Sequence, residues 1–199
     1  MGAVSATRDH DLALAQKAAA GDRAAQRELF QAQRKSVHHT LYRILGSNRD
    51  LEDLIQDAFL EIFRALGSFR GESSLSRWCQ TIATRTAYLA ISRRKPPSVD
   101  LAAVEDVIAG DDDTRRLAHV REAARRLYAA LERLDPKQRI AFALAVIDGR
   151  PLAEVALLTD SSVVAVKTRV WRARRELFKR AAKDHVLQPF LVELEGGKS

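Results

Sequence analysis

Apolar residues recur at every third or fourth position along most of the chain, the spacing of helices that bury one face. The clearest stripe lies between residues 51 and 66 and consists of Leu51, Leu54, Ile55, Ala58, Ile62 and Leu66. Asn48 or Asp50 precedes it as a candidate N-cap, and Gly67 follows its last residue. Alternation with a period of two, which marks a half-buried strand, does not stand out. The pattern therefore predicts an all-α protein.

Capping residues and glycines predict two further helices before this stripe. Asp9 or Asp11 can cap a first helix that stops at Gly21. Asp22 can then cap a second helix that ends before Gly46.

A fourth helix follows, opened by Ser73 or Ser74 and ended before Pro96, because a residue that precedes proline avoids the α region. Its predicted inward residues are Leu75, Trp78, Cys79, Ile82, Ala83 and Leu89. Arg85 falls inside that stripe, so we expect it to have a partner on a neighbouring helix. Together the four helices predict a compact bundle over residues 1–95.

The composition changes after this bundle. Residues 96–114 contain six acidic side chains and no basic one, which predicts a flexible acidic linker. Further helices are predicted over 115–134, 136–147, 151–158 and from 163 onward. The second of these follows Asp135-Pro136, a cap with proline at the first helical position. The chain thus divides into two small helical domains, 1–95 and 115–185, with a tail over 186–199.

The last long helix has one apolar face and one basic face. Its apolar stripe is Val163, Val166, Val170, Ala173 and Leu177, and the other sides carry Lys167, Thr168, Trp171, Arg172 and Arg175. A solvated basic face is common. However, a short helix and a four-residue turn come before it, which is the plan of a helix-turn-helix. Ser162 suits the N-cap, and Asp160 stands where such turns usually have glycine. We therefore predict that this helix enters the major groove of DNA.

Charge and composition narrow the class of protein. The net charge of +7 favours a polyanionic partner. Cys79 is the only cysteine, which excludes an internal disulfide and disfavours a Cys/His metal site. Neither a glycine-rich phosphate loop nor a hydrolase motif is present, so we expect no enzyme activity and no cofactor. The polar N-terminus and the lack of a long apolar run predict a cytoplasmic protein.

The third predicted helix carries an outward stripe of Asp53, Gln56, Asp57 and Glu61. A di-metal site would need inward ligands and Glu-x-x-His pairs, which are missing here. A solvated face remains an alternative. The stripe also suits docking of a basic partner.

Three stretches, in order, resemble bacterial RNA polymerase sigma factors of the extracytoplasmic-function (ECF) group. They are DLEDLIQDAFLEIFRALGSF at 50–69, RWCQTIATRTAYLAISRR at 77–94, and the 47 residues that begin LERLDPKQR and end WRARREL. The family pattern has different residues at Arg85, Leu89 and Asp160, so these positions leave the preferred promoter sequence open.

The resemblance implies a role for each part of the chain. The first domain would be sigma region 2, with Asp53, Gln56 and Asp57 on the β′ clamp helices of core polymerase. Its implied contacts with the melted −10 element are Phe69, Arg70, Ser74, Arg77, Arg93 and Arg94. The second domain would be region 4, near the β flap, reading the −35 element with Ser162, Lys167, Thr168, Trp171, Arg172 and Arg175. A cognate anti-sigma factor is a further implied partner.

Two other classes of protein stay open from the residues alone. A free-standing helix-turn-helix regulator would bind palindromic duplex DNA tightly without polymerase. A protein-binding adaptor would use its basic charge for solubility only, although Trp171 amid cations argues against it.

Overall fold

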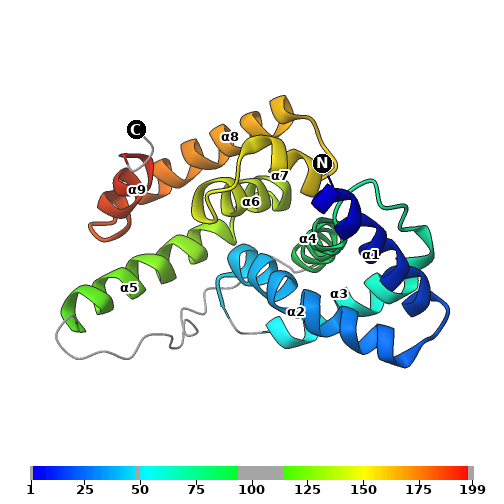
Figure 1. The fold of residues 1–199 in the computed structure, drawn as a ribbon. Coiled ribbons are helices and arrows are strands. Elements are labelled where there is room, and N and C mark those ends of the chain that lie inside the picture. The colour runs from blue at the N-terminus through cyan, green and yellow to red at the C-terminus, as the bar shows by residue number, and fades with distance from the viewer. Residues whose placement is uncertain (1, 48–49, 94–113, 197–199) are drawn as a thin grey trace.

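The computed structural model describes residues 2–47, 50–93 and 114–196, and no strand occurs among them. The N-terminal unit consists of α1 (Gly2–Ala19), α2 (Arg23–Leu45), α3 (Leu51–Ala65), the 3₁₀ turn η1 (Leu66–Ser68) and α4 (Leu75–Arg93). The C-terminal unit consists of α5 (Thr114–Leu131), α6 (Pro136–Phe142), the π turn η2 (Ala143–Ile147), α7 (Leu152–Leu158), α8 (Val163–Ala181) and α9 (Leu187–Gly196). The prediction of an all-α fold with two helical domains is confirmed (Figure 1). The linker predicted at 96–114 lies outside the described residues except for Thr114.

Several predicted caps are present. The Asp22 carboxylate accepts from the N–H groups of Ala24 and Ala25 at 2.8 and 3.1 Å, and thus caps α2. At the other end, Gly46 takes a left-handed conformation with φ of 76° and its N–H bonds the Tyr42 carbonyl. Such local signals fix helix ends because they satisfy backbone groups that have no partner within the helix.

The predicted start of the first helix is wrong. α1 begins at Gly2, well before Asp9 and Asp11. The Asp11 carboxylate instead accepts from the Leu75 N–H at 2.9 Å, at the start of α4. Ser74 caps the same helix by accepting from the Arg77 N–H at 3.3 Å. An acid inside one helix therefore completes the cap of another.

The predicted inward face of α4 is only partly right. Leu89 is 43% exposed, and Arg85 is also exposed and needs no buried partner. The buried row is Leu75, Cys79, Ala83, Thr84, Ala87 and Ile91. Its small members sit four residues apart, a spacing that lets α2 and α3 approach α4 closely.

The C-terminal unit begins with long α5 and closes with α9. Asp135 caps α6 by accepting from the N–H groups of Lys137 and Gln138, as its sequence predicts. The tail forms α9, whose Leu187 and Leu191 are buried in the contact with α5 and α8. Residues beyond the predicted domain end at 185 thus belong to the fold of this unit.

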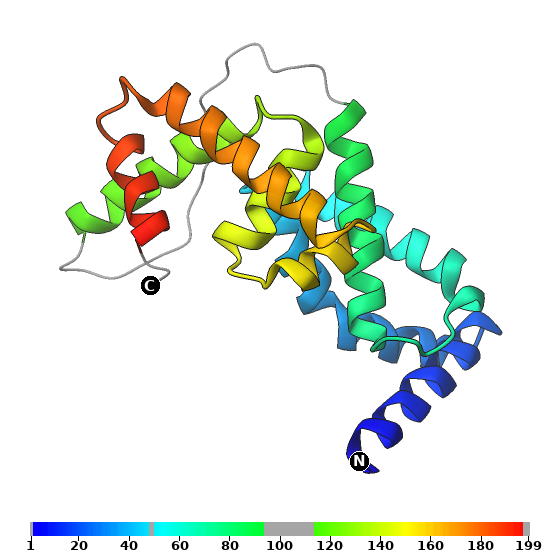
Figure 2. The same ribbon diagram turned by 90° about the horizontal axis from the view of Figure 1, so that it is seen from above.

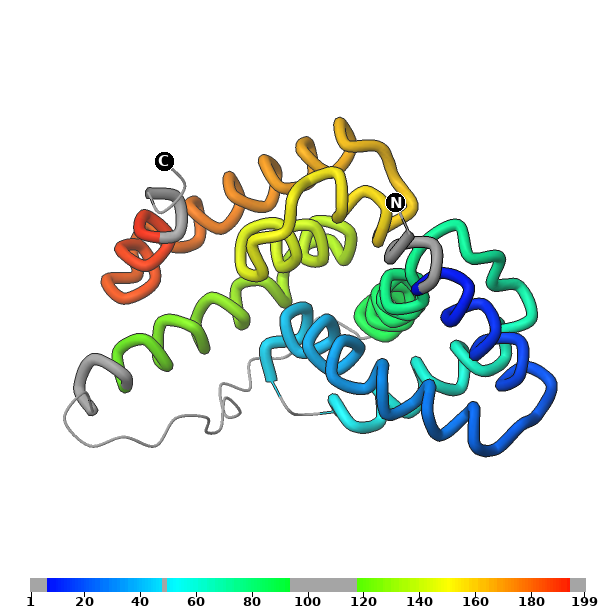
Figure 3. The backbone as a smooth tube through the Cα atoms, in the orientation of Figure 1, coloured from blue at the N-terminus to red at the C-terminus, as the bar shows by residue number. Residues whose placement is uncertain are grey.

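The two units pack against each other. α4 contacts α6 and α7, and α2 contacts η2, so buried residues of both units form one continuous core. Seen from above, α8 crosses over the units while α1 and α9 lie at opposite ends (Figure 2). The backbone tube shows α8 on the outer side of the C-terminal unit, away from α2 and α3 (Figure 3). This arrangement leaves one side of α8 open.

Candidate nucleic-acid interface

α7, a short turn and α8 form the helix-turn-helix. The Ser162 hydroxyl accepts from the Ala165 N–H at 3.2 Å and caps α8. The Ser161 N–H reaches the Ala156 carbonyl at 3.0 Å, which closes the turn. Asp160 has a φ of 46°, a left-handed conformation that favours glycine and that aspartate tolerates better than most residues. The turn therefore keeps its usual backbone shape although glycine is absent.

The outward side of α8 gathers the residues predicted to read DNA. Lys167, Thr168, Trp171, Arg172 and Arg175 are all exposed. Trp171 is 57% exposed, and the Arg175 guanidinium lies 5.5 Å from the centre of its ring. Val163, predicted to belong to the apolar stripe, is 45% exposed because it opens the helix beyond the core. The exposed face of α8 thus presents basic side chains and the ring of Trp171. In a helix-turn-helix, the N-terminal half of the second helix enters the major groove of DNA.

A second candidate surface is a cleft of about 590 Å³ beside the start of α4. Phe69, Arg70 and Arg77, three residues predicted to contact the −10 element, line it together. Phe69 is only 7% exposed because its ring packs on Trp78, at 5.4 Å between ring centres. Arg70 and Arg77 are exposed, and Phe69 and Trp78 give the cleft an aromatic lining beside Glu72. Such a combination suits an unstacked base and its phosphate.

The other residues predicted for the −10 element lie elsewhere. Exposed Ser74 uses its hydroxyl as the α4 cap. Arg93 lies at the far end of α4, and Arg94 falls outside the described residues. Leu157 also lines this cleft, and no local pattern predicts its place there because it comes from α7 of the other unit.

The acidic stripe of α3 faces outward. Asp53, Gln56 and Asp57 are exposed, and within the described residues no cluster of histidine, cysteine and acids has the arrangement of a metal site. Beside Asp57 runs a shallow groove of about 240 Å³ with the exposed leucines Leu60 and Leu89 on its walls. Arg64 and Arg93 also line this groove, so acidic, basic and apolar side chains lie together beside the acidic stripe. Such a mixed surface suits a protein partner.

Comparison with known proteins covers both units. The model of sigma-70 region 2 matches residues 29–96, and that of sigma-70 region 4 matches residues 124–177. The ECF RNA polymerase sigma-E factor of Escherichia coli strain K12 is 30% identical over 190 residues, covering 91% of this chain and 96% of that protein. The chain belongs to the ECF sigma factors. It is therefore a promoter-specificity subunit of RNA polymerase, without catalysis of its own, and not a free-standing regulator.

Other relatives agree with this assignment. The RNA polymerase sigma-H factor of Pseudomonas aeruginosa PAO1 is 27% identical over 196 residues, covering 94% of this chain and 98% of that factor. A solved structure of CnrH with the cytosolic domain of CnrY has the same fold, with a TM-score of 0.56, 23% identity and coverage of 95% and 99%. The sigma factor SigJ of Mycobacterium tuberculosis gives a TM-score of 0.51 at 28% identity, over 85% of this chain and 58% of that one. None of the described helices of this sigma factor is long and apolar enough to cross a membrane.

Proposed function

We propose that this sigma factor reads the −35 element with the outward face of α8 and holds the melted −10 strand in the cleft beside α4. The exposed Trp171 between cations on a serine-capped α8 is the observation that carries this proposal. The N-terminal half of the helix is the part that enters a major groove, and Lys167, Thr168, Trp171 and Arg172 lie on its open side.

Run-off transcription with core polymerase tests the assignment to the −35 element. A lost base contact weakens discrimination by about 1–3 kcal/mol, so Lys167→Ala and Arg172→Ala should each lower initiation roughly fivefold or more. Lys179→Ala is the matched control, because Lys179 is an exposed cation in the last turn of the same helix. Equal losses for all three variants would reject a specific role for the N-terminal half of α8.

We further propose that the acidic face of α3 docks on the β′ clamp helices of core polymerase in the cytoplasm. Asp57→Lys reverses the charge at the edge of the Leu60–Leu89 groove, and we expect a loss of core binding in size-exclusion chromatography. Glu28→Lys makes the same charge change at an exposed position of α2 and should leave binding intact. Retention of core binding by Asp57→Lys would contradict this docking surface.

A cognate anti-sigma factor is the third part of the proposal. Two structures of similar fold are complexes, CnrH with the cytosolic domain of CnrY and the sigma factor RpoE of Bartonella quintana with the anti-sigma factor NepR. Their identities of 23% and 20% support a shared fold, and a partner of this kind remains a proposal for the present chain. The test is inhibition of run-off transcription by the cytosolic part of a membrane protein encoded beside this gene.

A further inference from the structure

α8 carries a row of largely apolar side chains on the side that faces away from the core. Val164, in the first turn of the helix, is 74% exposed, the highest value among the large hydrophobic side chains that the structure describes. At about 100° per residue, Val164, Thr168 and Trp171 fall within an arc of roughly 60°, opposite the buried Val166 and Ala173. We call these three side chains the outward row of α8.

A single exposed valine is ordinary on a protein surface, but Val164 is not isolated. The structure describes eight exposed large hydrophobic side chains, and four of them belong to the helix-turn-helix: Leu157 of α7, and Val163, Val164 and Trp171 of α8. These two helices have only 7 and 19 residues. Such a concentration of exposed apolar side chains indicates a binding surface.

Thr168 adds to the apolar character of the row because its hydroxyl proton is already used. Its Oγ1 donates to the Val164 carbonyl at 2.9 Å, within α8. Thr168 therefore offers a partner its methyl group and an accepting oxygen, but no donor. Trp171 presents its indole ring, and the Arg175 guanidinium lies 5.5 Å from the centre of that ring. The indole N–H of Trp171 is thus the one hydrogen-bond donor among the side chains of the outward row.

The hydroxyl groups of the turn are also engaged within the protein. Oγ1 of Thr159 donates to the Val155 carbonyl at 2.7 Å, and Oγ of Ser161 lies 2.7 Å from Oγ1 of Thr159. The Ser162 hydroxyl caps α8 by accepting from the Ala165 N–H. Because these bonds hold the turn in shape, the exposed side chains of α8 are the groups that can read base edges.

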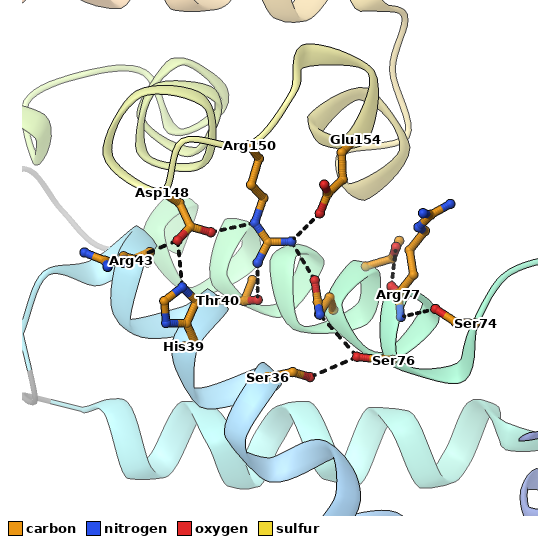
Figure 4. A network of polar contacts seen from close by, with 12 residues as sticks. Ser36, His39, Thr40, Arg43, Ser74, Ser76, Arg77, Asp148, Arg150 and Glu154 are labelled. Carbon is orange, nitrogen blue, oxygen red and sulfur yellow. Dashed lines mark hydrogen bonds and ion pairs between the residues drawn. The ribbon is translucent and has the colours of Figure 1, made fainter. Parts of the chain in front are cut away.

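The start of α7 is held by charged hydrogen bonds, which Figure 4 shows. The Arg150 guanidinium, just before α7, donates to Glu154 in the first turn of this helix at 2.8 Å and to Asp148 at 2.5 Å. α7 in turn packs against α8. The outward row therefore has a fixed orientation in the helix-turn-helix. A preorganised face loses little freedom on binding, so contacts as small as a methyl group can contribute to specificity.

Thymine is the base that such a surface recognises in the major groove. Its C5 methyl group is the only methyl group that the four unmodified bases present there, and apolar side chains contact it. The N-terminal residues of a recognition helix are the ones that reach base edges, and Val164 is among them in α8. Lys167 and Arg172 are exposed on either side of the outward row, where they can bind phosphates or guanines next to a thymine.

We propose that Val164, flanked by Thr168 and Trp171, contacts the methyl group of a thymine and makes that thymine a specificity-determining base of the −35 element. The inference rests on the proposed function, since it requires α8 to enter the −35 duplex. It adds the chemistry of the base contact, which is an apolar contact with a methyl group. The sigma factor then distinguishes thymine from uracil at this position, although both bases pair with adenine.

Run-off transcription with core polymerase tests the thymine contact in two steps. A library of duplex templates, randomised in the −35 region and barcoded in the transcribed part, first identifies the sequence that the wild-type sigma factor prefers. We expect at least one preferred thymine whose preference is relaxed by Val164→Ala. Val192→Ala is the matched control, because Val192 is a 56% exposed valine on α9, and this variant should select the same sequence as wild type.

Replacing the selected thymine by deoxyuridine then removes the methyl group alone. Loss of one buried methyl group corresponds to roughly a fourfold change, so initiation by wild type and by Val192→Ala should fall by about that factor. Val164→Ala should already initiate less well from the thymine template. It should show no further loss with deoxyuridine, because the two changes remove the same contact. Equal initiation by wild type from both templates would overturn the inference, as would a deoxyuridine effect of the same size in Val164→Ala.

The same library separates this inference from the proposed function. Lys167→Ala and Arg172→Ala report whether α8 reads the −35 element at all. A −35 preference that these two variants weaken, but that contains no thymine sensitive to Val164→Ala, supports the proposed function and rejects the thymine contact. A library without any preference in the −35 region rejects both.

Discussion

The single thiol of the protein lies in the buried row of α4. Burial raises the pKa of Cys79 to about 12, with a smaller contribution from the negative charge of Asp11. Because the thiolate is the nucleophile, the native thiol should be unreactive at neutral pH. We expect a thiol-specific reagent to label the native protein at least a hundredfold more slowly than the protein in denaturant. Rapid labelling at pH 7 would show that α4 is not packed as described.

Gly46 is a residue where conformation and packing act together. It ends α2 with a φ of 76°, and a Cβ at this position would overlap the ring of Tyr128. Gly46→Ala should therefore destabilise the protein by more than the roughly 1 kcal/mol of a left-handed alanine alone. Gly21→Ala is the matched control, with a φ of 91° and open space around it. Urea midpoints compare the two, and equal losses would mean that the Tyr128 contact adds nothing.

At the scale of the element, the start of α4 depends on a side chain from α1. The Leu75 N–H bonds Asp11, and such caps contribute about 1 kcal/mol. Asp11→Ala should lower the free energy of unfolding by roughly that amount, while Asp9→Ala, on an exposed part of α1, should have little effect. Urea denaturation followed by circular dichroism measures both changes. A smaller loss for Asp11→Ala than for Asp9→Ala would reject the cap.

α5 carries an ion-pair cluster that makes its stability depend on pH. Hydrogen bonds from Arg125 and then Arg126 lower the pKa of Glu122 from 4.5 to about 2. A depressed pKa means that stability is present above about pH 4.5 and is lost as the pH falls toward 2. Glu122→Gln should flatten this part of the acid denaturation profile. The side chain is 31% exposed, so solvent screens the effect and added salt should reduce it.

The same elements show how far sequence reasoning reaches. Asp22, Asp135 and Ser162 were predicted as caps because a cap acts on backbone two or three residues away. The outward face of α8 was predicted because a long helix has a regular period. The predicted inward face of α4 was partly wrong, since Leu89 is exposed whereas Thr84, Ala87 and Ile91, which were not predicted, are buried.

Contacts between segments that are far apart in the chain leave no comparable pattern in the amino-acid sequence. Arg150 stands between Gly149 and Pro151, where the sequence indicates only a turn, and its partners Gln80 and Thr40 lie 70 and 110 residues away. Arg139 lies in α6 next to apolar residues, and no neighbouring residue in the sequence indicates that its side chain caps α2. These roles exist only after the two units dock, so the packing of the units could not be predicted from local patterns.

At the scale of the whole molecule, docking couples the folding of two units that each have their own helices. Buried residues of both units form one core, and Arg139 ties that core to the end of α2. Two domains unfold together when the free energy of their contact is a large part of the stability of either. Wild-type protein should therefore unfold in urea in a single transition.

Trp78 in α4 and Trp171 in α8 are the two tryptophans, so Trp171→Phe leaves one fluorescent reporter, in the N-terminal unit. In this background, Trp78 fluorescence and circular dichroism should give coincident curves. Adding Arg139→Gln should separate them, because the units then unfold with their own midpoints and smaller slopes. Arg180→Gln, which changes the same charge outside the interface, should leave them coincident. Curves that already differ before Arg139 is changed would show that the units fold independently, and that docking contributes little to the stability of either.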